Sequence, residues 1–189
     1  MSDKVTYSSY LDLERILGAQ HPASAAHDEL LFIVVHQASE LWLKLCLHEL
    51  TQARVQIAED DLRPAFKMLS RVARAQTQLI QSWDVLSTMT PHDYSQIRPH
   101  LGGSSGFQSA QYRRMEFMLG GRNPDMIKLH DATPKTAAQL RDEAGRASLY
   151  DEAIRLLARR GLSIDDAVLE RAVDQPYAHN ASVEQAWAQ

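Results

Sequence analysis

The chain has 189 residues, of which 44% are hydrophobic and 23% are charged, as in an ordinary soluble globular protein with one core. The formal net charge of −4 gives no electrostatic support for binding to nucleic acid or to an anionic membrane surface. A single cysteine, Cys46, excludes an intrachain disulfide, and its apolar surroundings favour a buried structural thiol in a reducing cytoplasm.

Every periodic stretch has helical spacing and none alternates as a strand does, so we predict an all-α fold. The opening segment, MSDKVTYSSYLDLE, lacks the apolar region of a signal peptide, and Tyr7 and Tyr10 within it are expected to precede a helix. The longest apolar run, LLFIVV, is far shorter than the ~20 residues that span a bilayer. We therefore expect a cytoplasmic protein without a membrane segment.

Two long helices are predicted next. Residues 27–57 carry apolar side chains on more than one face, which is typical of a central, buried helix. Residues 62–87 keep apolar side chains on a single face.

A short helix should follow over Pro91–Arg98, with Thr90 as its N-cap and Pro99 as its stop. The glycine-rich turn LGGSSGFQS leads into a predicted helix over residues 107–119, which Gly120 and Gly121 end.

The pattern weakens over residues 122–146, where we expect a surface connection with a short helix at 137–143. An amphipathic helix then begins after Ser148 as N-cap. Ser163 is expected to cap a further short helix, and Ser182 with Gln185 forms a capping-box pattern for the last one.

His36 lies in the most apolar stretch of the chain and has two interpretations. Phe32 lies four residues before it, on the same helix face. His36 is either a core histidine bonded to a neighbour such as Glu40, or the polar edge of a pocket whose apolar wall is Phe32. A site that holds a metal through protein side chains alone is not expected, since HDELL is not HExxH and His36 with Glu40 lacks a third ligand.

Tyr94 and Arg98 also lie four residues apart on one face of a predicted helix. Arg98 is either an arginine that complements the helix dipole or, with the phenol of Tyr94, a clamp for a carboxylate. The nearby glycines match neither GxGxxG nor a P-loop, so nucleotide binding has no support. Tyr112 and Arg113 taken alone indicate no more than the surface of an amphipathic helix.

Four segments together resemble one family, the tryptophan 2,3-dioxygenases. They are YSSYLDLERILGAQHP, HDELLFIVVHQASELWLKLCLHEL, TMTPHDYSQIRPHLGGSSGFQSAQYRRMEF and SLYDEAIRLLARRG, in that order and with compatible spacing. The resemblance implies an all-α helical bundle of the tryptophan/indoleamine 2,3-dioxygenase type, a cytosolic homotetramer and haem b. It implies the insertion of both atoms of O2 into the indole C2–C3 bond of L-tryptophan, which gives N-formyl-L-kynurenine, in tryptophan catabolism by the kynurenine pathway.

The resemblance also implies roles for individual residues. His36 corresponds to the distal catalytic histidine that meets the indole N–H, and Phe32 to the aromatic residue beside the substrate. Arg98 corresponds to the arginine that binds the substrate carboxylate, with Tyr94 as its aromatic helper. The remaining implied positions are Leu101 and Gly106 at the substrate, Ser105, Tyr112 and Arg113 at the cofactor, and Tyr7, Tyr10 and Leu11 in a segment that enters a neighbouring subunit's site.

One departure from the family pattern concerns the haem iron. The family's proximal histidine lies near an RFRH motif followed by a GTGG turn, and neither motif occurs in this sequence. His130 and His179 do not match it, so no metal ligand is assigned here. We therefore expect residues 1–189 to be a single helical domain that is the N-terminal part of a longer chain. A related haem oxygenase for another aromatic substrate, and a non-catalytic truncated homologue, stay as alternatives.

Overall fold

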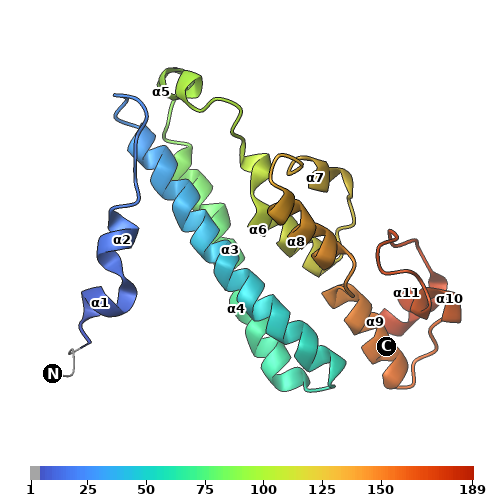
Figure 1. Ribbon diagram of the computed structural model, residues 1–189. Helices are drawn as coiled ribbons and strands as arrows, with labels where there is room; N and C mark the ends of the chain where they lie inside the picture. The colour runs from blue at the N-terminus through green and yellow to red at the C-terminus, as the bar shows by residue number, and fades with distance from the viewer. Residues whose placement is uncertain (1–4) are drawn as a thin grey trace. The chain divides into compact units, whose positions relative to one another are not determined.

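A computed structural model describes residues 5–189 of the chain (Figure 1). Within this range the regular structure is entirely helical, which confirms the predicted all-α class. The α-helices are α1 (Tyr7–Leu11), α2 (Leu13–Leu17), α3 (Glu29–Ala58), α4 (Leu62–Leu86), α5 (Pro91–Ile97), α6 (Ala110–Leu119), α7 (Asp125–Lys128), α8 (Pro134–Ala144), α9 (Leu149–Arg159), α10 (Asp166–Leu169) and α11 (Ala181–Trp187). Two 3₁₀ helices, η1 (Arg98–His100) and η2 (Gly106–Gln108), flank the glycine-rich turn.

The contacts divide the described residues into two compact units. The first unit comprises residues 5–38 and 82–104, and the second comprises residues 39–81 and 105–189. Helices α3 and α4 are each continuous across the boundary between them.

The N-terminal tyrosines lie inside a helix rather than before one. Thr6 caps α1 and exchanges hydrogen bonds with Ser9 in a capping box, so Tyr7 and Tyr10 are helical residues. Asp12 ends α1 in the left-handed conformation (φ 51°) and starts α2. The expectation that the tyrosines precede the helix was wrong because Thr6 supplies a cap upstream of both.

The core of the second unit lies between α3 and α4, which Figure 1 draws as an antiparallel pair. It also takes in two methionines of α6. Its buried members are Leu43, Cys46, Leu47, Leu50, Val72, Ala75, Met115 and Met118. Cys46 is fully buried, as predicted, and burial raises the pKa of its thiol.

Helix α3 is not buried on all sides, which corrects the prediction of a central helix. Leu30, Val34 and Leu41 are each about half exposed. The fully buried apolar residues of α3 all lie at or after Leu43, so the apolar composition of the helix before Leu43 does not lead to full burial in the described chain.

Helix α3 also passes a length and composition test for a membrane span, the single helix among residues 5–189 that does so. The most apolar stretch of 18 residues in α3 has a mean hydropathy of 1.5, and 17% of that stretch is buried. A core helix of a globular protein passes the same test, so one such helix is weak evidence for a membrane.

The caps around the glycine-rich turn explain where its helices begin. Thr90 caps α5, as predicted, and the structure adds a capping box between Thr90 and Asp93. Hydrogen bonds from the side chain and backbone of Thr90 lower the pKa of Asp93. The helix expected from residue 107 is divided in two, because Ser109 caps α6 and separates it from η2.

Residues 122–146 are not a surface connection. Helices α7 and α8 pack on α6 in a second core of Phe117, Ile127, Ala137 and Leu140. Glu143 of α8 is buried and accepts from Arg54 Nη1 at 2.8 Å. The short helix expected at 137–143 is confirmed, since it lies within α8. The surface connection was wrong because scattered polar residues in this segment have distant partners, which spacing along the chain does not reveal.

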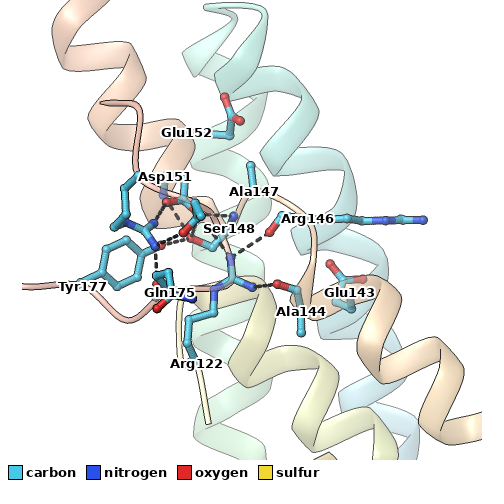
Figure 2. Close-up of polar contacts among 12 residues, drawn as sticks. Arg122, Glu143, Ala144, Arg146, Ala147, Ser148, Asp151, Glu152, Gln175 and Tyr177 are labelled. Carbon is cyan, nitrogen blue, oxygen red and sulfur yellow. Dashed lines mark hydrogen bonds and ion pairs between the residues drawn. The ribbon is translucent and has the colours of Figure 1, made fainter. Parts of the chain in front are cut away.

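A buried polar cluster fastens α9 to the segment before it and to the one after it (Figure 2). Its members, called the Asp151 cluster below, are Asp151, Ser148, Arg122, Arg171 and Tyr177. Asp151 pairs with Arg122 (Nη2 to Oδ2, 3.2 Å) and with Arg171, and it accepts from the backbone N–H of Ser148 at 2.7 Å. The exposed fraction of the side chain is 2% for Arg122 and 8% for Asp151.

The environment of Asp151 favours its charged form. Burial acts to raise the pKa of this carboxyl. Hydrogen bonds from the backbone and hydroxyl of Ser148 and from Tyr177, together with the charge of Arg171, outweigh burial and bring the pKa below its ordinary value. The ring of Tyr177 also lies under the Arg171 guanidinium at 4.2 Å and packs edge-on against Tyr150. The cluster therefore joins segments that are far apart in the sequence.

The caps of the two final helices differ from the prediction. Ser163 caps nothing, since α10 begins after Asp165 and has no side-chain cap bond. Asn180 caps α11 by accepting from the backbone N–H groups of Ser182 and Val183. The capping box expected of Ser182 and Gln185 was wrong because Asn180, two residues earlier, occupies the capping position.

Candidate functional site

Three aromatic side chains of the first unit lie together. The ring centroids of Phe32 and His36 are 4.2 Å apart, and those of Phe32 and Tyr94 are 6.2 Å apart. Phe32 and His36 meet because they are one turn apart on α3, while Tyr94 comes from α5. The sequence predicted the first contact from spacing alone, and the second joins segments that are far apart along the chain.

The hydrogen bond of His36 defines which of its ring nitrogens carries the proton. Nδ1 lies 2.7 Å from the carbonyl oxygen of Phe32. A carbonyl can only accept, so Nδ1 is the donor, and Nε2 of the neutral ring is then an acceptor. The structure therefore gives His36 a backbone partner in place of the predicted Glu40.

Glu40 is engaged elsewhere. Gln111 Nε2 donates to the Glu40 carbonyl oxygen at 2.8 Å and to its carboxylate at 2.7 Å. This pair ties α6 to α3 within the second unit. Among residues 5–189 no group of three or more potential ligands is arranged to hold a metal ion, so His36 and Glu40 have no third ligand there.

Arg98 and Tyr94 line an open hollow of about 670 Å³ in the first unit. Its other lining residues are Pro91, Ser95, Pro99 and Gly102. Arg98 Nη1 donates to the Gly102 carbonyl oxygen at 2.8 Å, which holds the guanidinium against the turn. Gly102 has φ +56°, a conformation that favours glycine, so this turn depends on residue type.

The other predicted substrate residues of the first unit are less enclosed. Leu101 follows η1 and is partly buried. Tyr7 and Tyr10 of α1 are 76% and 79% exposed, and Leu11 is partly buried. Tyr7 and Tyr10 therefore project from a helical arm, α1, in which Leu11 is partly covered.

The remaining predicted residues belong to the second unit. Ser105 caps η2, and Gly106 is its first residue. Arg113 of α6 is buried and pairs with Glu116 at 2.6 Å, and its guanidinium lies 4.7 Å from the Tyr112 ring centroid. Burial raises the pKa of Glu116, and the charge of Arg113 opposes that shift.

Arg113 has an unused donor. Its Nε is buried and forms no hydrogen bond in the structure. A buried guanidinium with a spare N–H and an aromatic neighbour suits an additional anion such as a carboxylate. The chemistry of Arg113 is thus compatible with an anionic group, and the cofactor role of Tyr112 and Arg113 stays a prediction.

Sequence reasoning missed Ser95 as a lining residue of the hollow. It lies three positions before Arg98 on α5, so helical spacing offered a signal that was not used. The partner of Glu40 was beyond such reasoning, because Gln111 lies 71 residues away.

Comparison with known proteins identifies the family. The sequence profile of a family described as tryptophan 2,3-dioxygenase matches residues 1–144. The chain is 73% identical over its whole length to a tryptophan 2,3-dioxygenase of Erythrobacter litoralis, of which it covers 72%. It is 56% identical over 97% of its length to the enzyme of Cupriavidus necator, and 54% identical over 98% to tryptophan 2,3-dioxygenase 1 of Ralstonia nicotianae. It spans 62% and 63% of those two relatives. The chain belongs to the tryptophan 2,3-dioxygenase family.

Proposed function

We propose that the chain binds L-tryptophan and forms the substrate-binding part of a haem-dependent dioxygenase that produces N-formyl-L-kynurenine from L-tryptophan and O2. The observation that carries the proposal is the group of Phe32, His36 and Tyr94, with Arg98 beside Tyr94 at an open hollow. An amino acid with an indole ring needs an apolar wall, an acceptor for its N–H and a cation for its carboxylate. The first unit holds all three.

His36 provides the acceptor. Its Nδ1–H is committed to the Phe32 carbonyl, so Nε2 is left to accept from the indole N–H. The same bond orients the imidazole relative to the Phe32 ring, on which the indole can pack. Protonation would turn Nε2 into a donor, and we therefore expect substrate binding to require neutral His36.

Arg98 provides the cation. One N–H is bound to the Gly102 carbonyl, and the planar guanidinium has further donors for a carboxylate. Tyr94 lines the same hollow, and its hydroxyl supplies a third bond to the ligand. These groups bind and orient the amino acid through its charged end.

The cofactor proposed for the whole protein is haem b. Bound haem supplies the activation of O2. Arg113, with its unused Nε, and Tyr112 are the residues that would hold its propionate side, and Ser105 and Gly106 lie in the loop before them. Phe32 and the other apolar side chains of the substrate site would exclude water.

We also propose a homo-oligomer, a tetramer as in the family, and a cytoplasmic location. Two observations support an assembly: the exposed tyrosines of the N-terminal arm and the exposed apolar side chains of α3. In this proposal Tyr7, Tyr10 and Leu11 complete the substrate site of another subunit.

Addition of haem and then L-tryptophan to the purified protein tests the proposed function. Because no haem-iron ligand is assigned in these 189 residues, we expect saturable binding of L-tryptophan by the chain itself. A Soret band that changes with tryptophan, and a product with the mass of N-formylkynurenine, are expected of the whole protein of which the chain is the substrate-binding part. In His36→Phe the Soret band of the whole protein should persist, and tryptophan binding should weaken roughly three- to tenfold, the value of one hydrogen bond. A chain that does not bind tryptophan would refute the proposal.

A second candidate is a protein that binds tryptophan without converting it. Conversion needs a ligand for the haem iron, and two histidines follow Arg113 in the sequence. Nε2 of His130 is buried, and Nε2 of His179 pairs with Glu184 at 3.1 Å, which favours this candidate. Tryptophan binding with no product, in the same experiment, would identify this candidate. A panel of substituted indoles would separate both from an oxygenase with another aromatic substrate.

A further inference from the structure

The segment between α2 and α3 is held by a buried carboxylate. Glu29, at the start of α3, is 2% exposed. Its carboxylate accepts from the backbone N–H groups of Ala23 at 2.8 Å and Ser24 at 2.7 Å, and also from the Ser24 hydroxyl. Both carboxylate oxygens are thus used to hold one short stretch of backbone.

A second side chain of α3 holds the same segment nearer to α2. Gln37 Nε2 donates to the Ala19 carbonyl oxygen at 3.0 Å. Its Oε1 accepts from Gln20 Nε2 at 2.5 Å, and Gln20 in turn donates to the Ile16 carbonyl oxygen at 3.0 Å. Gln37 therefore fixes the end of α2 through both atoms of its amide.

These two side chains bracket Phe32 and His36, the two residues of α3 that face the substrate in the proposed function. Glu29 lies three positions before Phe32, and Gln37 directly follows His36. Beyond the attached segment the arm is exposed, as the values for Tyr7 and Tyr10 show. The attachment at residues 19–24 is thus the root from which the arm extends.

We propose that Glu29 and Gln37 are positioning residues that fix the root of the N-terminal arm on the helix that carries Phe32 and His36. This inference rests on the proposed function, because the contact of Tyr7, Tyr10 and Leu11 with substrate is itself part of that proposal. The two side chains set where the arm starts, and so which positions its tyrosines can reach.

Hydrogen exchange and tryptophan kinetics of Glu29→Gln and Gln37→Leu test this inference. In Glu29→Gln the new amide replaces an acceptor with a donor, so exchange of the Ala23 and Ser24 amides should rise about tenfold. The KM for tryptophan should rise at least about threefold with kcat within about twofold, because the arm and not the reacting centre is displaced. Asp28→Asn removes a neighbouring charge without touching the segment and serves as the matched control.

Each result has one meaning. Unchanged exchange at Ala23 and Ser24, or faster exchange with an unchanged KM, overturns the positioning role. A fall in melting temperature that accounts for the whole change in KM also overturns it, in favour of a merely structural role. Wild-type protein that neither binds nor converts tryptophan refutes the proposed function, and the substrate role of the two residues with it, whatever the exchange rates are.

Discussion

The Asp151 cluster and the group of Phe32, His36, Tyr94 and Arg98 contain similar polar side chains but differ in how many of their hydrogen-bonding atoms are paired. In the cluster one buried carboxylate meets two guanidiniums, a hydroxyl and a backbone N–H, so its acceptor capacity is taken up within the protein (Figure 2). In the group, His36 Nε2 and most donors of Arg98 have no partner in the hydrogen bonds described above. The paired and buried polar groups stabilise the fold, while in the proposed function the spare ones beside an apolar ring bind the ligand.

Removal of the Asp151 carboxylate should have the largest effect on folding. Asp151→Ala leaves Arg122 and Arg171 with a buried, uncompensated charge, which typically costs ~3–5 kcal/mol in the free energy of unfolding. Urea denaturation measures this cost, and tryptophan affinity of the folded protein should be unchanged. A loss below about 1 kcal/mol would mean that the cluster is no stronger than a surface ion pair.

Acid should weaken the same cluster. Because the pKa of Asp151 in the folded protein is below its ordinary value, its contribution is fully present above the unfolded value of about 4. The contribution is lost as the pH falls through the lower, folded value. Denaturation at a series of pH values should thus show a decline below about pH 4 that is smaller in Asp151→Asn. Parallel curves for the two proteins would contradict the assignment.

The sequence predicted features that depend on near neighbours. The Thr90 and Ser148 caps, the extents of α3 and α4 and the Phe32–His36 contact all involve residues within a few positions of each other. The prediction for the cap of α11 was wrong only because two nearby polar residues, Asn180 and Ser182, can both cap a helix. Asn180 occupies the capping position.

The features that the sequence did not predict depend on distant partners. Arg122 and Arg171 lie 29 and 20 residues from Asp151, and nothing in their spacing links them. Likewise, nothing in the spacing of Gln111 and Glu40, which lie 71 residues apart, links these two residues. The predicted burial of α3 failed for a related reason: its composition indicates many apolar contacts, but among the described residues its fully buried apolar side chains lie only at or after Leu43.

Calorimetric titration of L-tryptophan into wild-type protein and Arg98→Ala tests the central claim most directly. Loss of a bidentate bond to the carboxylate costs ~2–5 kcal/mol, so the Kd should rise at least about 30-fold, with no change in melting temperature. Arg98→Lys should lie between the two because it keeps the charge and loses the fork, and Arg63→Ala, on the exposed side of α4, should bind as wild type does. A rise in Kd of less than about threefold in Arg98→Ala would contradict the carboxylate clamp.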